Sequence, residues 1–207
     1  IKNGSYGKLM KAYYAKQDAE KLSGKGDTSQ KLTLMKTSAD SLKKSADALN
    51  DSSLWEKKKI KKKDEKTGEE IEVEDYDWDK ITKAVKSFVE DYNDVVKEAG
   101  ESNTKDVLRN ASWMTGMTDK NSNMLAKIGI TIGKGNKLEL DEDALKQADI
   151  SSLKTVFTGY NSFVSKISQK ATGISNAANR ASATYTNNGT YSKTDSSLTS
   201  SKIDKEV

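Results

Sequence analysis

The sequence predicts a mainly α-helical protein: an elongated, antiparallel, coiled-coil-like helical bundle with a small β-hairpin insert and a short loop, strand and helix unit. Three observations predict this fold class. Apolar residues recur at alternating spacings of three and four in three long segments, which is the period of one helix face. None of the 207 residues is proline, so no helix is interrupted by one. Hydrophobic residues make up 34% and charged residues 32% of the chain, which is typical of a narrow core beneath a large solvated surface.

The three predicted helices span 28–51, 78–99 and 160–185. Each carries one apolar stripe, here called its seam, and the first and third seams are rich in alanine. Because such faces are stable only when covered, we expect the three helices to share one core. Alanine-rich seams also allow identical helices of other copies to approach, so the seam residues are candidates for self-association. They are Leu32, Met35, Ala39, Leu42, Ala46 and Leu49; Ile81, Val85, Phe88, Tyr92, Val95 and Ala99; and Tyr160, Val164, Ile167, Ala171, Ile174, Ala178, Ala181 and Tyr185.

Two inserts separate the predicted helices. In 54–76 a lysine run, a turn and an acidic run follow one another, and Ile71 and Val73 alternate with acidic residues. We therefore expect a β-hairpin with lysines facing glutamates, which caps the seam between two antiparallel helices. In 125–145, glycines and alternating apolar residues predict a compact loop, strand and short helix. The predicted division of the chain is an N-terminal arm (1–27), a bundle domain (28–185) and a Ser/Thr-rich C-terminal tail (186–207).

Helix ends are predicted from glycine and from short polar residues. We expect Gly100 to form a left-handed C-cap on the second helix, with Ser102 or Asn103 capping the next one. Asp141 should cap the short helix of the second insert. The three tryptophans are expected to pack as hinges near helix ends; they are Trp55, Trp78 and Trp113.

The composition removes most enzyme chemistry. The chain has no histidine and no cysteine, which excludes thiol nucleophiles, disulfides, imidazole relays and Cys/His zinc sites. The segment 75–79 imitates the opening of a calcium loop, but Lys80 and Lys86 stand where glycine and a bidentate glutamate are needed. We therefore expect a protein that is not an enzyme, with no catalytic residues, no metal and no cofactor.

Two stretches of the sequence resemble one known family. One is Phe88 to Val96, which contains Phe-Val-Glu-Asp-Tyr-Asn, and the other runs from Leu125 to Leu145 with Phe157 downstream. Over about residues 85–160 the chain resembles the C-terminal region of flagellar hook-associated protein 2, the filament cap. The residues that carry the second motif are Leu125, Ile128, Gly129, Ile130, Leu138, Leu140, Asp141, Leu145 and Phe157.

The resemblance implies a structural assembly protein of the bacterial flagellum that promotes flagellin polymerisation, adhesion or both. It implies a homo-oligomer that meets flagellin or other axial proteins, and an extracellular location reached without a cleavable signal peptide. Members of the family usually carry one or two large β domains between the helix pair, where this chain has only the insert 54–76. The resemblance therefore supports a secreted assembly protein more firmly than it supports capping itself.

Two alternatives remain at this stage. The first is a secreted adhesin or binding module without a capping role, which holds a host surface or a sugar through the hairpin and the region 102–124. The second is a nucleic-acid-binding protein that uses the lysines of 57–63, and it is the weaker one because the acidic run of 69–75 offsets their charge. No apolar segment approaches the roughly 18 residues of a membrane span, so we expect none.

Overall fold

The computed structural model describes residues 26–63 and 68–183. The predictions for the N-terminal arm before residue 26, for the turn 64–67, for Tyr185 and for the C-terminal tail lie outside the described residues.

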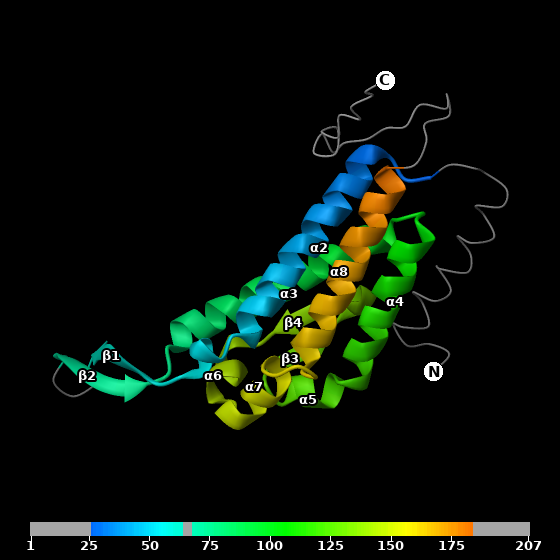
Figure 1. Cartoon of the computed structure of the whole chain (residues 1–207). Helices are drawn as coiled ribbons and strands as arrows, with labels where there is room; N and C mark the ends of the chain where they lie inside the picture. Colours follow the sequence, from blue (N-terminus) through cyan, green and yellow to red (C-terminus); the bar gives the residue numbers. More distant parts are fainter. Residues whose placement is uncertain (1–25, 64–67, 184–207) are drawn as a thin grey trace, which may run out of the picture.

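Four long helices form an antiparallel bundle: α2 (Ser29–Asn50), α3 (Trp78–Gly100), α4 (Lys105–Lys120) and α8 (Phe163–Ser182). Helix α8 lies beside α2 along most of its length, α4 covers the other flank of α8, and α3 packs against α2 (Figure 1). The predicted helices 28–51 and 78–99 and the mainly α-helical fold class are confirmed.

Shorter elements form a hairpin and a compact unit at the end of the bundle where α8 begins (Figure 1). Strand β1 pairs with β2, as predicted for the hairpin, and β3 pairs with β4, both antiparallel. The sequence analysis predicted one strand in 125–145, whereas the structure has two, β3 and its partner β4. The shorter elements are η1 (Ser52–Trp55), β1 (Lys58–Lys63), β2 (Glu70–Asp75), α5 (Ser122–Ala126), β3 (Ile130–Ile132), η2 (Lys134–Asn136), β4 (Leu138–Leu140), α6 (Glu142–Gln147) and α7 (Ile150–Phe157).

The contact between α2 and α8 combines small apolar residues with a repeated polar clamp. Ser175 donates a hydrogen bond of 2.6 Å to Asp40, and Ser168 donates one of 2.7 Å to Asp47. The two aspartates are one heptad apart and so are the two serines, so these bonds fix an antiparallel register. Lysines one helical turn before each aspartate donate to the same carboxylates, Lys36 to Asp40 and Lys43 to Asp47.

An aromatic cluster joins the bundle to the shorter elements. Trp55 of η1 stacks on Phe157 of α7 at 5.4 Å and 9°, and its ring nitrogen donates to the carbonyl of Leu49 at 2.8 Å. Phe88 meets Phe157 and Phe163 edge-on at 6.5 and 6.2 Å. Elements from distant parts of the chain therefore share one core at this end.

Two predictions of helix ends are wrong. The third helix begins at Phe163 rather than at residue 160, because Ser162 accepts a hydrogen bond from the Ser165 amide as N-cap and Gly159 turns the chain with a φ of +98°. Tyr160 therefore lies outside the seam and is 83% exposed. Gly100 is helical rather than left-handed.

The position that caps α4 also differs from its prediction. Thr104, rather than Ser102 or Asn103, is the N-cap of α4, and its own side chain makes no capping bond.

Two further expectations about placement fail. The hairpin does not cap the seam; it projects from the end of the bundle (Figure 1). Trp113 lies in the middle of α4 and is 61% exposed, so it is not a hinge at a helix end. Trp55 is buried beside the end of α2, as a hinge position requires, and Trp78 opens α3.

Asp27 caps the start of α4 from more than seventy residues away in sequence. Its carboxylate accepts hydrogen bonds from the Ser102 and Thr104 hydroxyls, both at 2.7 Å, and from the Asn103 and Thr104 amides, both at 2.9 Å. The side chain is only 1% exposed. Burial alone would raise the pKa of Asp27, but the hydrogen bonds outweigh it and lower that pKa below its ordinary value.

Replacing Asp27 with alanine should lower the free energy of unfolding by about 2 kcal/mol near neutral pH, because a helix cap is lost and several donors lose their partner.

The effect of Asp27 on stability should depend on pH. The pKa of Asp27 is lower in the folded state than in the unfolded state, so this stabilisation is present above the unfolded value of about 3.9 and is lost as the pH falls through the folded value. Urea denaturation should show the difference between variant and wild type closing below about pH 4. The control D94A, at an exposed site on α3, should change stability by less than about 0.5 kcal/mol. A difference that persists unchanged in acid would contradict this account.

Gly173 allows α8 to approach α4 closely. A Cβ atom at this position would lie 2.6 Å from Oδ1 and 3.0 Å from Cγ of Asn110. That amide is held in place because its nitrogen donates to the carbonyl of Asp106 at 2.8 Å. The glycine therefore serves packing, although it lowers the intrinsic helix propensity of α8.

The substitutions G173A and N110A should be coupled. In the N110A background, G173A should raise the free energy of unfolding by about 1 kcal/mol, the helix-propensity gain. In the wild type, the clash with Asn110 should remove at least about 0.5 kcal/mol of that gain. Denaturant unfolding of the four proteins measures the coupling, and equal gains in both backgrounds would rule out the clash.

Candidate assembly surface

The predicted seams are buried within the single chain. Tyr160 is exposed, Ala181 is partly buried and Tyr185 lies outside the described residues. The larger seam residues are otherwise at most 4% exposed; they are Leu32, Met35, Leu42, Leu49, Ile81, Val85, Phe88, Tyr92, Val95, Val164, Ile167 and Ile174. The hydroxyl of Tyr92 is also satisfied internally, since it donates to Thr118 at 2.9 Å, and burial raises the pKa of Tyr92. In the folded chain these side chains form the core, so a second copy of the chain would have to contact other, exposed residues.

The family-motif residues build the compact unit and its contact with the bundle. Six of them are at most 2% exposed and Leu140 is partly buried against the same core; the six are Leu125, Ile128, Ile130, Leu138, Leu145 and Phe157. Asp141 caps α6 by accepting from the amides of Asp143 and Ala144 at 3.0 and 2.9 Å. These contacts serve folding and turn geometry.

Gly129 must be glycine for two reasons. Its φ is +79°, in the left-handed region that disfavours side chains. A Cβ atom there would also lie 2.6 Å from the carbonyl oxygen of Asp141 and 2.9 Å from the amide nitrogen of Leu145. The Gly129 carbonyl in turn accepts from the Asp141 amide at 2.8 Å, which joins the start of β3 to the start of α6.

Asn93 connects α3 to this unit and was not singled out as a site residue from the sequence. Its amide nitrogen donates to the Leu138 carbonyl at 2.9 Å, and its amide oxygen accepts from the Leu138 nitrogen at 2.6 Å. The side chain thus pairs with the backbone of β4 as a neighbouring strand would. The sequence signal for this role was the position of Asn93, a polar residue on the apolar face of the predicted helix 78–99.

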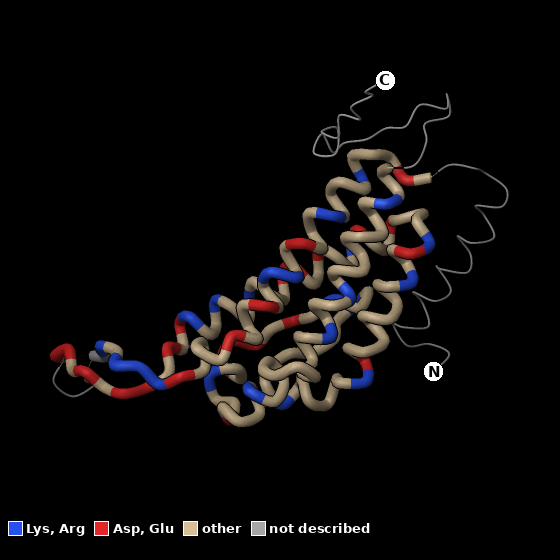
Figure 2. Tube along the Cα trace, viewed as in Figure 1, with Lys and Arg blue, Asp and Glu red and all other residues tan. Residues whose placement is uncertain are grey.

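The hairpin carries the strongest separation of charge in the described chain. Strand β1 is rich in lysine and strand β2 in acidic residues, and the two lie side by side (Figure 2). The register pairs Lys59 with Glu74, Lys61 with Glu72 and Ile60 with Val73. Because directly opposite residues share a face and neighbours in a strand alternate, one face is charge-paired throughout. The other, here called the apolar face, carries Ile60, Ile71 and Val73, together with Lys62 and the pair of Lys58 and Asp75.

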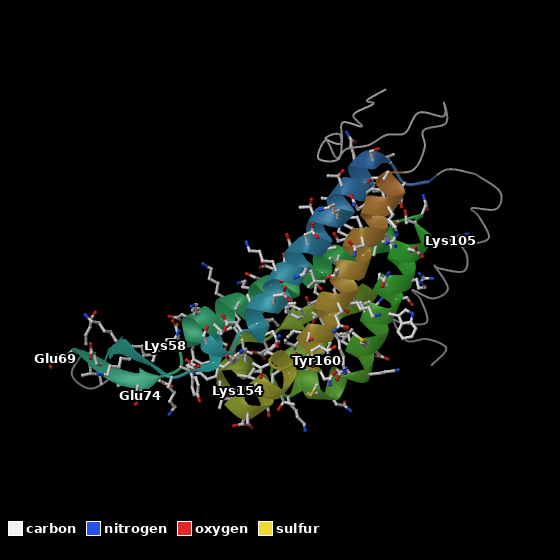
Figure 3. The ribbon with its side chains drawn as sticks, in the orientation of Figure 1. Lys58, Glu69, Glu74, Lys105, Lys154 and Tyr160 are labelled. Atoms are coloured by element: carbon white, nitrogen blue, oxygen red, sulfur yellow. The ribbon has the colours of Figure 1, made fainter. Side chains whose placement is uncertain are left out.

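The charge pairs of the hairpin are solvated. Lys61 Nζ lies 3.5 Å from a carboxylate oxygen of Glu70, and the two side chains are 69% and 61% exposed. On the apolar face, Ile60 and Val73 are half-buried and Ile71 is 40% exposed. Glu69 lies at the far tip of the hairpin and Lys58 nearer the bundle (Figure 3).

A pocket of about 290 Å³ lies where the hairpin joins α3. The rings of Tyr76 and Trp78 meet there at 6.4 Å, and the ammonium groups of Lys57 and Lys154 lie 5.8 and 6.0 Å from the centre of the Tyr76 ring. The pocket is lined by Ile60, Lys61, Tyr76, Asp77, Trp78 and Asp79. Aromatic and cationic contacts of this kind support the base of the hairpin.

The described surface has a further groove between two helices. This groove of about 380 Å³ between α2 and α3 is lined mostly by serine, alanine and lysine, and Asp91 is the one acidic residue among its described lining residues. Burial raises the pKa of Asp91. Over 26–63 and 68–183, no three Asp or Glu side chains gather as a metal site would require. No helix in the same ranges is apolar enough over a sufficient length to cross a membrane.

Comparison with known proteins places the chain in one family. The model of the flagellar hook-associated protein 2 C-terminus matches residues 102–206, just over half of the chain. The match takes in α4, the β3–β4 unit and α8, whereas α2, the hairpin and α3 precede it. No curated protein and no solved structure matches the chain. The chain belongs to the flagellar hook-associated protein 2 family.

Proposed function

We propose that this protein is an extracellular structural component of the bacterial flagellum, which acts at the filament as a cap-related protein and promotes flagellin polymerisation. Its partners are further copies of itself and flagellin or other axial proteins. It acts by assembly rather than by catalysis. The observation that carries the proposal is the family match over residues 102–206.

The packing of the matched segment supports a role as one rigid body. Seam residues of α8 such as Ala171, Ile174 and Ala178 are fully buried, and α8 packs chiefly on α2, which lies outside the match. The matched segment therefore depends on the preceding helices for its core. A bundle of this kind suits a protein that transmits contacts between subunits without rearranging its interior.

The projecting hairpin supports self-association through the surface. Because the seams are buried inside each chain, contacts between copies need exposed elements, and the hairpin extends furthest from the bundle (Figure 1). Its charges are solvated, and they contribute little to the stability of the single chain. They remain available to select a partner.

A second candidate is a secreted adhesin, and the exposure of Trp113 favours it. This side chain lies on α4, within the region 102–124, and the ammonium of Lys170 lies 5.3 Å from its ring centre. An exposed tryptophan ring offers an apolar face and a polar edge on which a ligand can stack. The nucleic-acid alternative has no comparable support, since four of the five lysines of β1 lie opposite acidic residues of β2.

Deletion of the gene in the source organism tests the cap proposal. We expect short or absent filaments and flagellin released into the medium, both restored by the wild-type gene. Complementation with W113A separates the candidates, because a cap needs the bundle and an adhesin needs the exposed ring. Normal filaments without flagellin leakage in the deletion strain would refute the cap proposal, and loss of surface adhesion alone in W113A would favour the adhesin.

The purified chain should form a closed oligomer. Multi-angle light scattering should give a mass that is a multiple of the 22.7 kDa of one chain. A mass of one chain at every concentration tested would contradict self-association and favour the binding module.

A further inference from the structure

We propose that the hairpin is the contact between copies, with the β2 edge of one copy pairing with the β1 edge of the next in a continuous sheet. This inference rests on the proposed self-association and specifies where it occurs. The occupant is a second copy of this chain, and the argument is charge complementarity between the two edges of one two-stranded sheet.

Both edges of the hairpin are open in the described structure. The sheet contains β1 and β2 alone, and no other strand of 26–63 or 68–183 pairs with either. The outward backbone groups of each strand thus form a template for another strand. An isolated two-stranded hairpin is marginal in water, and added strands would stabilise it.

The charges permit one pairing of edges and oppose the others. Strand β1 carries Lys59, Lys61 and Lys63, and the register sets them opposite Glu74, Glu72 and Glu70 of β2. Two β1 edges or two β2 edges would place like charges opposite each other, which is destabilising. Only a β2 edge against a β1 edge brings lysines beside glutamates, so the contact is directional.

Strand direction supports the same arrangement. Strands β1 and β2 are antiparallel. If β1 of the next copy also pairs antiparallel to β2, it runs in the same direction as the first β1, so every hairpin points the same way. Copies that point the same way are related by rotation, and a head-to-tail contact of this type closes into a ring when the rotation permits. The apolar face formed by Ile60, Ile71 and Val73 would then extend across copies instead of ending at each hairpin.

Two triple charge reversals test the proposal. The variant K59E/K61E/K63E makes both strands acidic, and E70K/E72K/E74K makes both basic. Each alone should weaken self-association at least tenfold, as measured by multi-angle light scattering over a dilution series. An equimolar mixture should restore the oligomer, because each β2 edge then meets an oppositely charged β1 edge.

A combined variant carrying all six reversals guards against loss of the hairpin itself. It sets opposite charges against each other both within each hairpin and between copies, so it should self-associate like the wild type. The control K120E/K127E/K166E changes exposed lysines on other elements and should leave the oligomer intact.

Each outcome decides between the inference and the function on which it rests. If wild type and both triple variants give the same oligomer, the hairpin contact is wrong and self-association stands. If the two triple variants are monomers that do not combine on mixing, the charges act within one hairpin and the inference is overturned. A wild type that is monomeric at every concentration overturns self-association and the hairpin contact together.

Discussion

The antiparallel contact between α2 and α8 is the constraint on which the structure depends. Ala39 and Ala46 are fully buried on α2, and the bonds from Ser175 to Asp40 and from Ser168 to Asp47, one heptad apart, fix the register of the two helices. Helix α8 lies within the segment that matches the family, and α2 lies before that segment. Their contact therefore joins residues more than one hundred positions apart in the sequence. It also buries both seams, so the proposed contacts between copies would fall on exposed elements.

The elements were predictable wherever the signal is local. The heptad steps of α2 and α3, the lysine and glutamate runs of the hairpin, and the Asp141 cap each lie within a short window of sequence. Tyr160 continues the apolar period of α8, but Gly159 and the Ser162 cap determine where the helix begins. The Ser162 cap outweighs one further apolar residue, because it satisfies a free amide of the first helical turn, and the positive φ of Gly159 turns the chain away from the helical path.

The rest required the tertiary fold. Asp27 has no local pattern that relates it to α4, because its partners at 102–104 become neighbours only after α2 and α3 have packed. Asn93 binds the backbone of Leu138, a pairing that no spacing along one helix predicts. The direction of the hairpin also depends on its base, where Tyr76 and Trp78 meet. The sequence therefore predicted which residues make up the hairpin, but not how exposed the hairpin is or in which direction it projects.

In the proposed contact between copies, the charges of the hairpin would matter more than they do within one chain. An exposed pair such as Lys61 and Glu70 contributes only about 0 to 1 kcal/mol to a single chain, since water already solvates both groups. The same charges arranged along an open edge discriminate among partners, because every wrong alignment sets like charges against each other. Backbone pairing would supply the attraction, and the lysine and glutamate strands would determine which edges meet and in which order.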